Sequence, residues 1–231
     1  MALPAIEALA ERFRVVVHAP RWGATLYGHL GVPIHGVGQL EAGDAAVLFS
    51  PSLRTAWHAR HLPRRVGVPA DHRRFLLTDI VEEGLHTSDT YENLADVFGV
   101  SVARAPTWSP MKMPTDVPVG HVAMNPLSAT AATREWGRWT ELAASFARPV
   151  VFYGGPGEHD RLKDVARGFP FRVGMELHAL ANALQQASVL ISVDTGPAHF
   201  ARAVGVPTVV IHGSTTPAGS GPAGSRAVEG S

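Results

Sequence analysis

Hydrophobic residues along the chain follow two spacings, and these spacings predict its helices and strands. Residues 3–13 carry apolar side chains at helical intervals, which predicts an opening helix. Further amphipathic stretches at residues 53–62 and 87–100 predict two more helices, the second with Ser88 or Asp89 as its N-cap. Short apolar runs, typical of buried strands, lie at residues 13–20, 45–50 and 64–68.

The second half of the chain alternates more regularly between apolar runs and amphipathic stretches. Strands are predicted at residues 121–126, 150–155, 189–193 and 208–213. Helices are predicted at residues 138–147, 158–169, 177–187 and 197–205. Strands that are apolar throughout and separated by helices are typical of a parallel sheet covered on both faces. The pattern therefore predicts an α/β protein.

Two stretches lack this periodicity and indicate the domain organisation. Residues 104–118 hold four prolines and no regular spacing, which is typical of a linker. We therefore expect an N-terminal domain over residues 1–110 and a C-terminal domain over residues 119–213. Residues 214–231 are mostly small and polar, and we expect them to form a flexible tail without regular structure.

Composition narrows the class of protein. The chain has 231 residues, 45% of them hydrophobic and 17% charged, which is typical of a soluble globular protein. Its formal net charge is zero, so no overall field favours nucleic acid. It contains no cysteine, which excludes disulfides and thiolate metal ligands, and the histidines show no metal-ligand spacing. We expect no signal peptide, no membrane-spanning helix and a cytoplasmic location.

Asp194, Thr195, Gly196 and His199 mark the junction between a predicted strand and the helix after it. Ligands of open α/β sheets bind beyond the carboxyl ends of the strands, and a helix N-terminus attracts anions. A glycine at this junction lets a ligand approach the backbone closely. The alternative is that Asp194 only caps the helix and His199 is an ordinary surface histidine. The spacing alone leaves both interpretations open.

Two other strand ends carry polar residues, each with a plain structural alternative. Arg134 follows a loop of small and hydroxyl residues that fits around phosphate, or it is simply a solvated arginine. Glu158 follows a glycine-rich turn, where its carboxylate suits ribose hydroxyls, or it only compensates the helix dipole. The arginines between residues 54 and 74 are expected to form a solvated face, or to meet an anionic acceptor if they line a cleft.

Taken together, these segments resemble glycosyltransferase family 9, the ADP-heptose:lipopolysaccharide heptosyltransferases and their relatives. "LISVDTGPAHFARAVGVPTVVIHGSTTP" (residues 190–217) is similar to the hallmark segment of that family. "LPRRVGV" and "LHTSDTYENLADVFGV" resemble pieces of its first domain. The resemblance implies a GT-B-like α/β fold, in which two Rossmann-like domains with parallel sheets face each other across a cleft.

The resemblance also implies roles for the candidate residues. Asp194, Thr195, Gly196 and His199 would hold the diphosphate and sugar of the donor. Arg134 stands where the family usually has a lysine and would contact phosphate, and Glu158 matches the glutamate that holds the nucleoside. No cofactor or metal is implied, because an ADP-sugar is the donor substrate.

Three departures from the family pattern shape the expected activity. The chain begins inside the family's first helix, so we expect its opening strand and the acidic catalytic base to be missing. Thr216 replaces the aspartate of the closing turn, and the sequence ends where relatives continue. As written, the chain is expected to bind nucleotide better than it catalyses.

The function expected from the sequence is inverting transfer of a heptose or similar sugar from an ADP-activated donor. The acceptor would be lipopolysaccharide core or another glycan, with a peripheral contact at the inner membrane face and no nucleic acid as partner. One alternative is a non-catalytic remnant that binds nucleotide sugars. Another is a sugar-nucleotide epimerase or hydrolase with the same fold.

Overall fold

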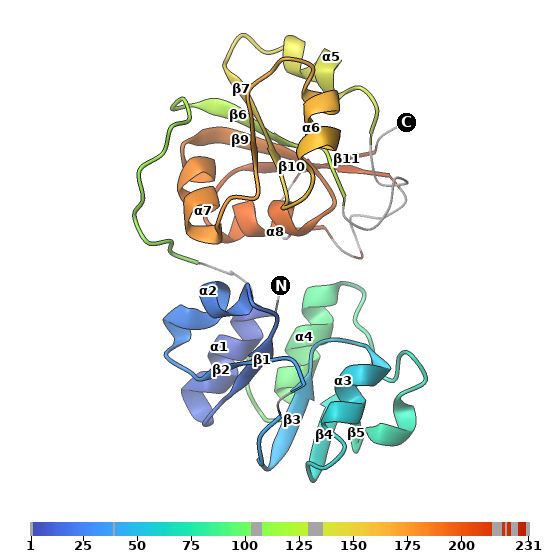
Figure 1. Cartoon of the computed structure of the whole chain (residues 1–231). Coiled ribbons are helices and arrows are strands. Elements are labelled where there is room, and N and C mark those ends of the chain that lie inside the picture. The colour runs from blue at the N-terminus through green and yellow to red at the C-terminus, as the bar shows by residue number, and fades with distance from the viewer. Residues whose placement is uncertain are drawn as a thin grey trace. The chain divides into compact units, whose positions relative to one another are not determined.

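A computed structural model of the chain describes residues 2–38, 40–102, 108–128, 136–213, 219, 221–222 and 226–229. The chain divides into two compact units, residues 1–106 and 107–231 (Figure 1). The division falls inside the proline-rich stretch 104–118, slightly before the boundary expected from the sequence. Every strand pair in both units is parallel over the described residues, as the apolar runs predict.

The first unit contains two small parallel sheets, β1–β2 and β3–β4–β5. Its strands are β1 (Val17–Ala19), β2 (Ile34–Gly36), β3 (Ala45–Leu48), β4 (Arg64–Gly67) and β5 (Asp79–Ile80). Its helices are α1 (Leu3–Arg12), α2 (Gly23–Tyr27), α3 (Leu53–His58) and α4 (Thr87–Asp96), with short 3₁₀ turns at Gly28–Leu30 and Arg74–Leu76. Apolar residues of α1 and α4 pack into one cluster around Leu9 and Ala95.

Helix α4 begins two residues earlier than an N-cap at Ser88 predicts. Its N-cap is His86, not Ser88 or Asp89. The imidazole Nδ1 of His86 accepts the Ser88 N–H at 3.1 Å, and the Asp89 carboxylate accepts the His86 N–H at 3.2 Å. An imidazole nitrogen therefore takes the place of the usual hydroxyl or carboxylate cap, which N-cap preferences do not anticipate.

The second unit is built on one six-stranded sheet with the order β11-β10-β9-β6-β7-β8. Its strands are β6 (His121–Asn125), β7 (Val150–Gly154), β8 (Phe171–Val173), β9 (Ala187–Val193), β10 (Thr208–His212) and β11 (Arg226–Glu229). Its helices are α5 (Trp139–Ala144), α6 (His159–Ala166), α7 (Leu177–Gln185) and α8 (Gly196–Ala203). Helices α5 and α6 lie on one face of the sheet, and α7 and α8 lie on the other (Figure 1).

The core of the second unit explains why its strands read as continuous apolar runs. Both faces of the central strand β6 are covered, and all five of its residues are buried. Trp139 of α5, Phe152 of β7 and Leu162 of α6 fill the space on one face. Burying a large apolar side chain contributes roughly 1.5–3 kcal/mol, so this layer stabilises the sheet on that face.

The segment expected to be a flexible tail contains a strand. Residues Arg226–Glu229 form β11 and pair in parallel with β10, from Val209 opposite Arg226 to His212 opposite Glu229. An edge strand needs only backbone pairing on one side, so it requires little of the apolar pattern that predicts buried strands. Strands β2, β5 and β8 were likewise not predicted, since each has three residues or fewer.

Candidate functional site

A pocket of about 160 Å³ lies at the carboxyl ends of the strands of the second unit. Its walls come from β6, β7 and β8, from helix α7, and from the start of α8. The described lining residues are Asn125, Tyr153, Gly154, Gly155, Pro156, Arg172, Gly174, Met175, Leu177, Leu180, Leu184, Leu190 and Pro197. Parallel strands bring their carboxyl ends to one edge, which is where α/β sheets bind ligands. Leucines line much of this pocket, which suits a flat apolar ring.

Asn125 is one of the polar groups in this pocket that sequence reasoning missed. It ends β6, is 3% exposed, and its side-chain oxygen makes no hydrogen bond with the described residues. A buried amide without a partner costs about 1–3 kcal/mol relative to a satisfied one. Such a group at a pocket wall favours a ligand with a hydrogen-bonding edge.

The junction between β9 and α8 places the predicted donor residues beside the pocket. Asp194 is buried at the end of β9, and Thr195 is the N-cap of α8. The Thr195 hydroxyl donates to the carbonyl of Val193 at 3.3 Å and makes no capping bond. A Cβ added to Gly196 would meet no atom within 4 Å among the described residues, so the space beside its backbone is open. The helix start is thus accessible, as a phosphate site requires.

Asp194 lies between two histidines. Nε2 of His199 and Nδ1 of His212 each lie 4.0 Å from a different carboxylate oxygen of Asp194. His199 was predicted from the sequence, whereas His212 at the end of β10 was not. The side chain of His212 is only 1% exposed. The sequence signal that could have found His212 is a polar residue at the end of an apolar strand, because a polar group buried there needs a partner.

Glu158 is placed apart from Asp194, at the start of α6. Its Oε2 accepts the N–H of Gly155 at 2.6 Å, and its Oε1 lies 3.9 Å from Arg161. Gly154 and Gly155 line the pocket, so Glu158 supports the turn that forms one wall. Glu158 itself is not among the described lining residues. Its proposed contact with a nucleoside stays a prediction.

Tyr153, which lines the pocket, forms a buried hydrogen-bonded pair with His121. Nδ1 of His121 donates to the carbonyl of Pro118 at 2.8 Å, so its Nε2 accepts from the Tyr153 hydroxyl at 2.9 Å. Burial lowers the pKa of His121 and raises the pKa of Tyr153. Both shifts favour the neutral form of each group, and the hydrogen bond fixes the Tyr153 ring where it lines the pocket.

Arg134 and Thr216, the other two positions singled out in the sequence, lie outside the described residues. Of the remaining candidates, the structure brings Asp194, Thr195, Gly196 and His199 together at one junction.

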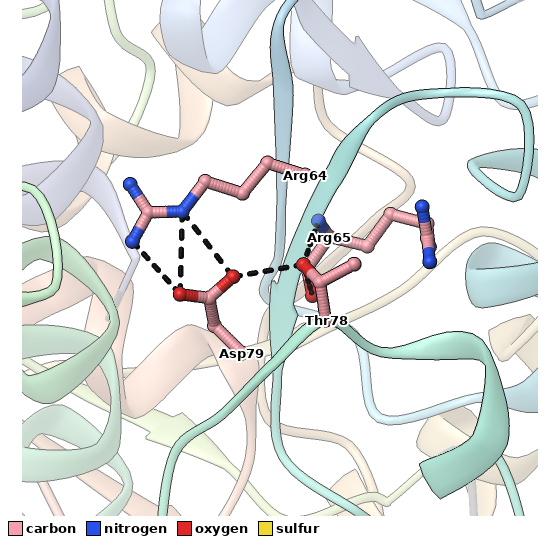
Figure 2. Close-up of polar contacts among 4 residues, drawn as sticks. All are labelled: Arg64, Arg65, Thr78 and Asp79. Atoms are coloured by element: carbon pink, nitrogen blue, oxygen red, sulfur yellow. Dashed lines mark hydrogen bonds and ion pairs between the residues drawn. The ribbon is translucent and has the colours of Figure 1, made fainter.

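In the first unit, the arginines near residues 54–74 are engaged largely in internal contacts. Arg64 forms an ion pair with Asp79 at 2.8 Å (Figure 2). The Thr78 hydroxyl donates to the same carboxylate at 2.8 Å and accepts the backbone N–H of Arg65 at 2.7 Å (Figure 2). Hydrogen bonds from Arg64 and Thr78 lower the pKa of Asp79. These contacts tie β4 to β5.

Arg73 is fully buried in the first unit. Its Nε donates to the carbonyl of Val68 at 2.8 Å, and its Nη1 donates to the carbonyl of Ser50. Its guanidinium therefore joins the segments that follow β3 and β4, which is a structural role.

In the part of the chain that the structure describes, no group of three or more His, Asp or Glu side chains is arranged to hold a metal ion. No helix there has both the length and the apolar character needed to cross a membrane.

The fold places the chain in the GT-B-like class of α/β folds, with parallel sheets in both units. Its structure is similar to that of Escherichia coli ADP-heptose LPS heptosyltransferase II, with a TM-score of 0.74 and 15% identity over 98% of this chain and 85% of that one. It is also similar to Escherichia coli heptosyltransferase WaaC with ADP, with a TM-score of 0.70 and 20% identity over 99% of this chain and 88% of that one. At these identities the likeness concerns the fold.

The sequence identifies the family within that class. Residues 103–230 match the profile of glycosyltransferase family 9 (heptosyltransferase), and the chain belongs to this family. It is 32% identical over 114 residues to lipopolysaccharide heptosyltransferase 1 of Escherichia coli K12. That match covers 46% of this chain and 35% of the relative, so the chain matches about a third of the length of this curated relative.

Proposed function

We propose that this chain transfers a heptose from ADP-heptose to the core of lipopolysaccharide, with the ADP moiety bound by the second unit. The observation that carries the proposal is the leucine-lined pocket at the carboxyl ends of the strands, with Asn125 in its wall and Pro197 of α8 at its boundary. An adenine ring fits such a site, because it offers an apolar face together with hydrogen-bonding edges. The start of α8 then lies where a diphosphate is expected.

The roles proposed for the junction residues follow from their positions. Gly196 leaves space for a phosphate against the backbone, and Thr195 offers a hydroxyl beside it. Asp194 and His199 would orient the sugar and diphosphate from the end of β9. Arg134 would contribute a cation to the phosphates. Glu158 would contact the nucleoside ribose while supporting the Gly155 turn, since a carboxylate has acceptor capacity for more than one hydrogen bond.

The proposed reaction displaces ADP from the anomeric carbon of the sugar with inversion. An acceptor hydroxyl forms the new bond to that carbon, the bond to the diphosphate oxygen breaks, and a base takes the hydroxyl proton. Stabilising the negative charge on the departing diphosphate contributes most to such a step. Escherichia coli heptosyltransferase WaaC has been solved with ADP and with ADP-2-deoxy-2-fluoro heptose, and this supports ADP-heptose as the donor. Action in the cytoplasm at the inner membrane face is part of the same proposal.

Calorimetric titration with ADP tests the binding half of the proposal. We expect saturable binding by the parent chain, weakened about tenfold or more by Arg134→Ala, because this change removes a cationic contact worth about 1.5–3 kcal/mol. Asp194→Asn is also expected to weaken binding, because it removes the carboxylate that lies between His199 and His212 at the start of α8. Arg138→Ala is the matched control for Arg134, since its side chain is 69% exposed and pairs only with Glu141 among the contacts described. Absence of ADP binding by the folded parent chain would refute the site.

A transfer assay tests the other half. ADP release from ADP-heptose in the presence of lipopolysaccharide core acceptor is expected to depend on both substrates. Tight ADP binding without acceptor-dependent ADP release would favour the binding-only alternative and contradict the proposed activity.

A further inference from the structure

We infer that residues 108–118 form a brace that holds the walls of the nucleotide pocket in place, and that Asn182 and Asp116 are its positioning residues. The inference rests on the proposed function, because it concerns binding of ADP to that pocket. None of residues 108–118 is among the described residues that line the pocket. The 108–118 segment nevertheless contacts elements that supply several of its walls.

The first link joins the 108–118 segment to helix α7. The buried amide of Asn182 donates from Nδ2 to the carbonyl of Met111 at 2.7 Å and accepts the N–H of Met113 at 3.2 Å. The Met111 N–H donates to Nδ1 of His178, one turn earlier in α7, at 3.1 Å. Leu177, Leu180 and Leu184 of the same helix line the pocket.

The Trp108 ring adds an apolar anchor to this link. It is 3% exposed and stacks on the ring of His178 with centroids 5.0 Å apart. The ring also contacts the ring of Phe200 in α8, with centroids 5.3 Å apart, and the backbone N–H of Trp108 donates to the carbonyl of Ala203 at 2.8 Å. The beginning of the 108–118 segment is thereby held against both α7 and α8.

The second link joins the segment to β8. Asp116 binds Arg172 through both of its oxygens, at 2.6 Å to Nη2 and 3.3 Å to Nε. Arg172 also donates from Nη1 to the carbonyl of Phe171 at 3.0 Å, so its guanidinium is held on three nitrogens. Arg172 lines the pocket, whereas the Asp116 side chain is 73% exposed. The ion pair therefore fixes the position of a pocket cation from outside the pocket.

The third link joins the end of the segment to β7. The carbonyl of Pro118 accepts from His121, and His121 accepts from the Tyr153 hydroxyl in the pocket wall. Three separate hydrogen-bonded routes thus run from one irregular stretch to α7, β8 and β7. Strands β7 and β8 share no backbone pairing with α7, so the 108–118 segment supplies a connection between them. A proline-rich stretch suits this role, because backbone polar groups that are not used in a helix or sheet remain free to bond side chains.

The Asn182→Ala and Asp116→Asn variants of the full chain test the brace. Titration with ADP is expected to show affinity lowered about threefold to thirtyfold in each variant. The reason is that loss of either link displaces a pocket wall by a fraction of an ångström, which weakens the contacts between ADP and the other residues of that wall. Gln185→Ala is the control for Asn182, since Gln185 lies in α7 and its amide donates to Val204 at 3.3 Å, outside the 108–118 segment. Glu141→Gln is the control for Asp116, because it breaks an exposed ion pair of 2.8 Å with Arg138.

Two readouts separate positioning from general destabilisation. Asp116→Asn is expected to leave the thermal midpoint nearly unchanged while ADP binds more weakly, because exposed ion pairs contribute little to stability. Asn182→Ala is expected to speed hydrogen exchange of α7 amides, with α5 and α6 amides unchanged. Unchanged or tighter ADP binding by Asp116→Asn and Asn182→Ala, beside normal binding by the parent, would overturn the inference.

The outcomes also distinguish the two proposals. If the parent chain does not bind ADP, the proposed function fails, and hydrogen exchange alone then decides the brace. In that case α7 amides that exchange no faster in Asn182→Ala than in the parent would overturn it.

Discussion

Replacing Asn125 with leucine is expected to stabilise the folded chain and to weaken ADP binding at the same time. The side-chain oxygen of Asn125 is buried and has no hydrogen-bond partner in the described part of the chain, and the residue is 3% exposed. Leucine has a similar volume and removes the unsatisfied group. The change therefore relieves a penalty in the free chain while it removes a contact for the nucleotide.

The two effects can be given magnitudes from the structure. An unsatisfied buried amide costs about 1–3 kcal/mol, and partial relief of that cost predicts a gain of roughly 1 kcal/mol in the free energy of unfolding. Loss of one neutral hydrogen bond to the ligand is worth about 0.5–1.5 kcal/mol, which corresponds to about a twofold to tenfold weaker ADP affinity. A gain in stability with a loss of binding is typical of residues kept for a ligand.

Urea unfolding and ADP calorimetry of Asn125→Leu and Asn182→Leu give the comparison. Asn182 is also a buried amide, but its Nδ2 donates to the carbonyls of Met111 and His178 at 2.7 Å each, so its replacement is expected to destabilise the chain by about 2–4 kcal/mol. Destabilisation of similar size in both variants would refute the reasoning, because it would show that Asn125 is satisfied in solution.

Three further predictions concern other residues. Arg73→Ala is expected to lower the free energy of unfolding of the first unit by about 2–4 kcal/mol in urea, because it leaves carbonyls such as that of Val68 without their donor, and to leave that of the second unit unchanged. Gly196→Ala is expected to change stability by less than about 1 kcal/mol but to weaken ADP binding in calorimetry, since the space beside it is open for ligand. His121→Gln is expected to flatten the pH dependence of urea unfolding. Burial lowers the pKa of His121 below 6.5, so its contribution is complete above pH 6.5 and is lost as the pH falls from there toward the folded-state pKa. A parent chain equally stable above and below pH 6.5 would contradict this.

The sequence predicted those features that depend on local pattern. Apolar runs such as 208–213 correspond to strand β10, and the amphipathic stretch 177–187 corresponds to helix α7. The strand-to-helix junction at Asp194 and Gly196 was also predicted, because a strand end, a glycine and a helix start are adjacent in the chain.

Features that depend on distant residues were not predicted. Asn125 and His212 look like ordinary strand ends in the sequence, and their importance comes from burial beside other elements. The 108–118 segment looked like a linker because its prolines carry no periodicity. Its order comes instead from Asn182 and Arg172, which lie more than fifty residues away. Strand β11 depends in the same way on the free edge of β10.

The most direct test of the central claim is a chemical-shift titration of the isotope-labelled chain with ADP. The account predicts saturable shifts for the amides of Gly155, Met175 and Gly196, which surround the pocket and the start of α8. Amides of α5, on the opposite face of the sheet from α7 and α8, are expected to stay unchanged (Figure 1). Shifts confined to residues remote from the pocket, or no saturable shift at all, would contradict the assignment of the nucleotide site.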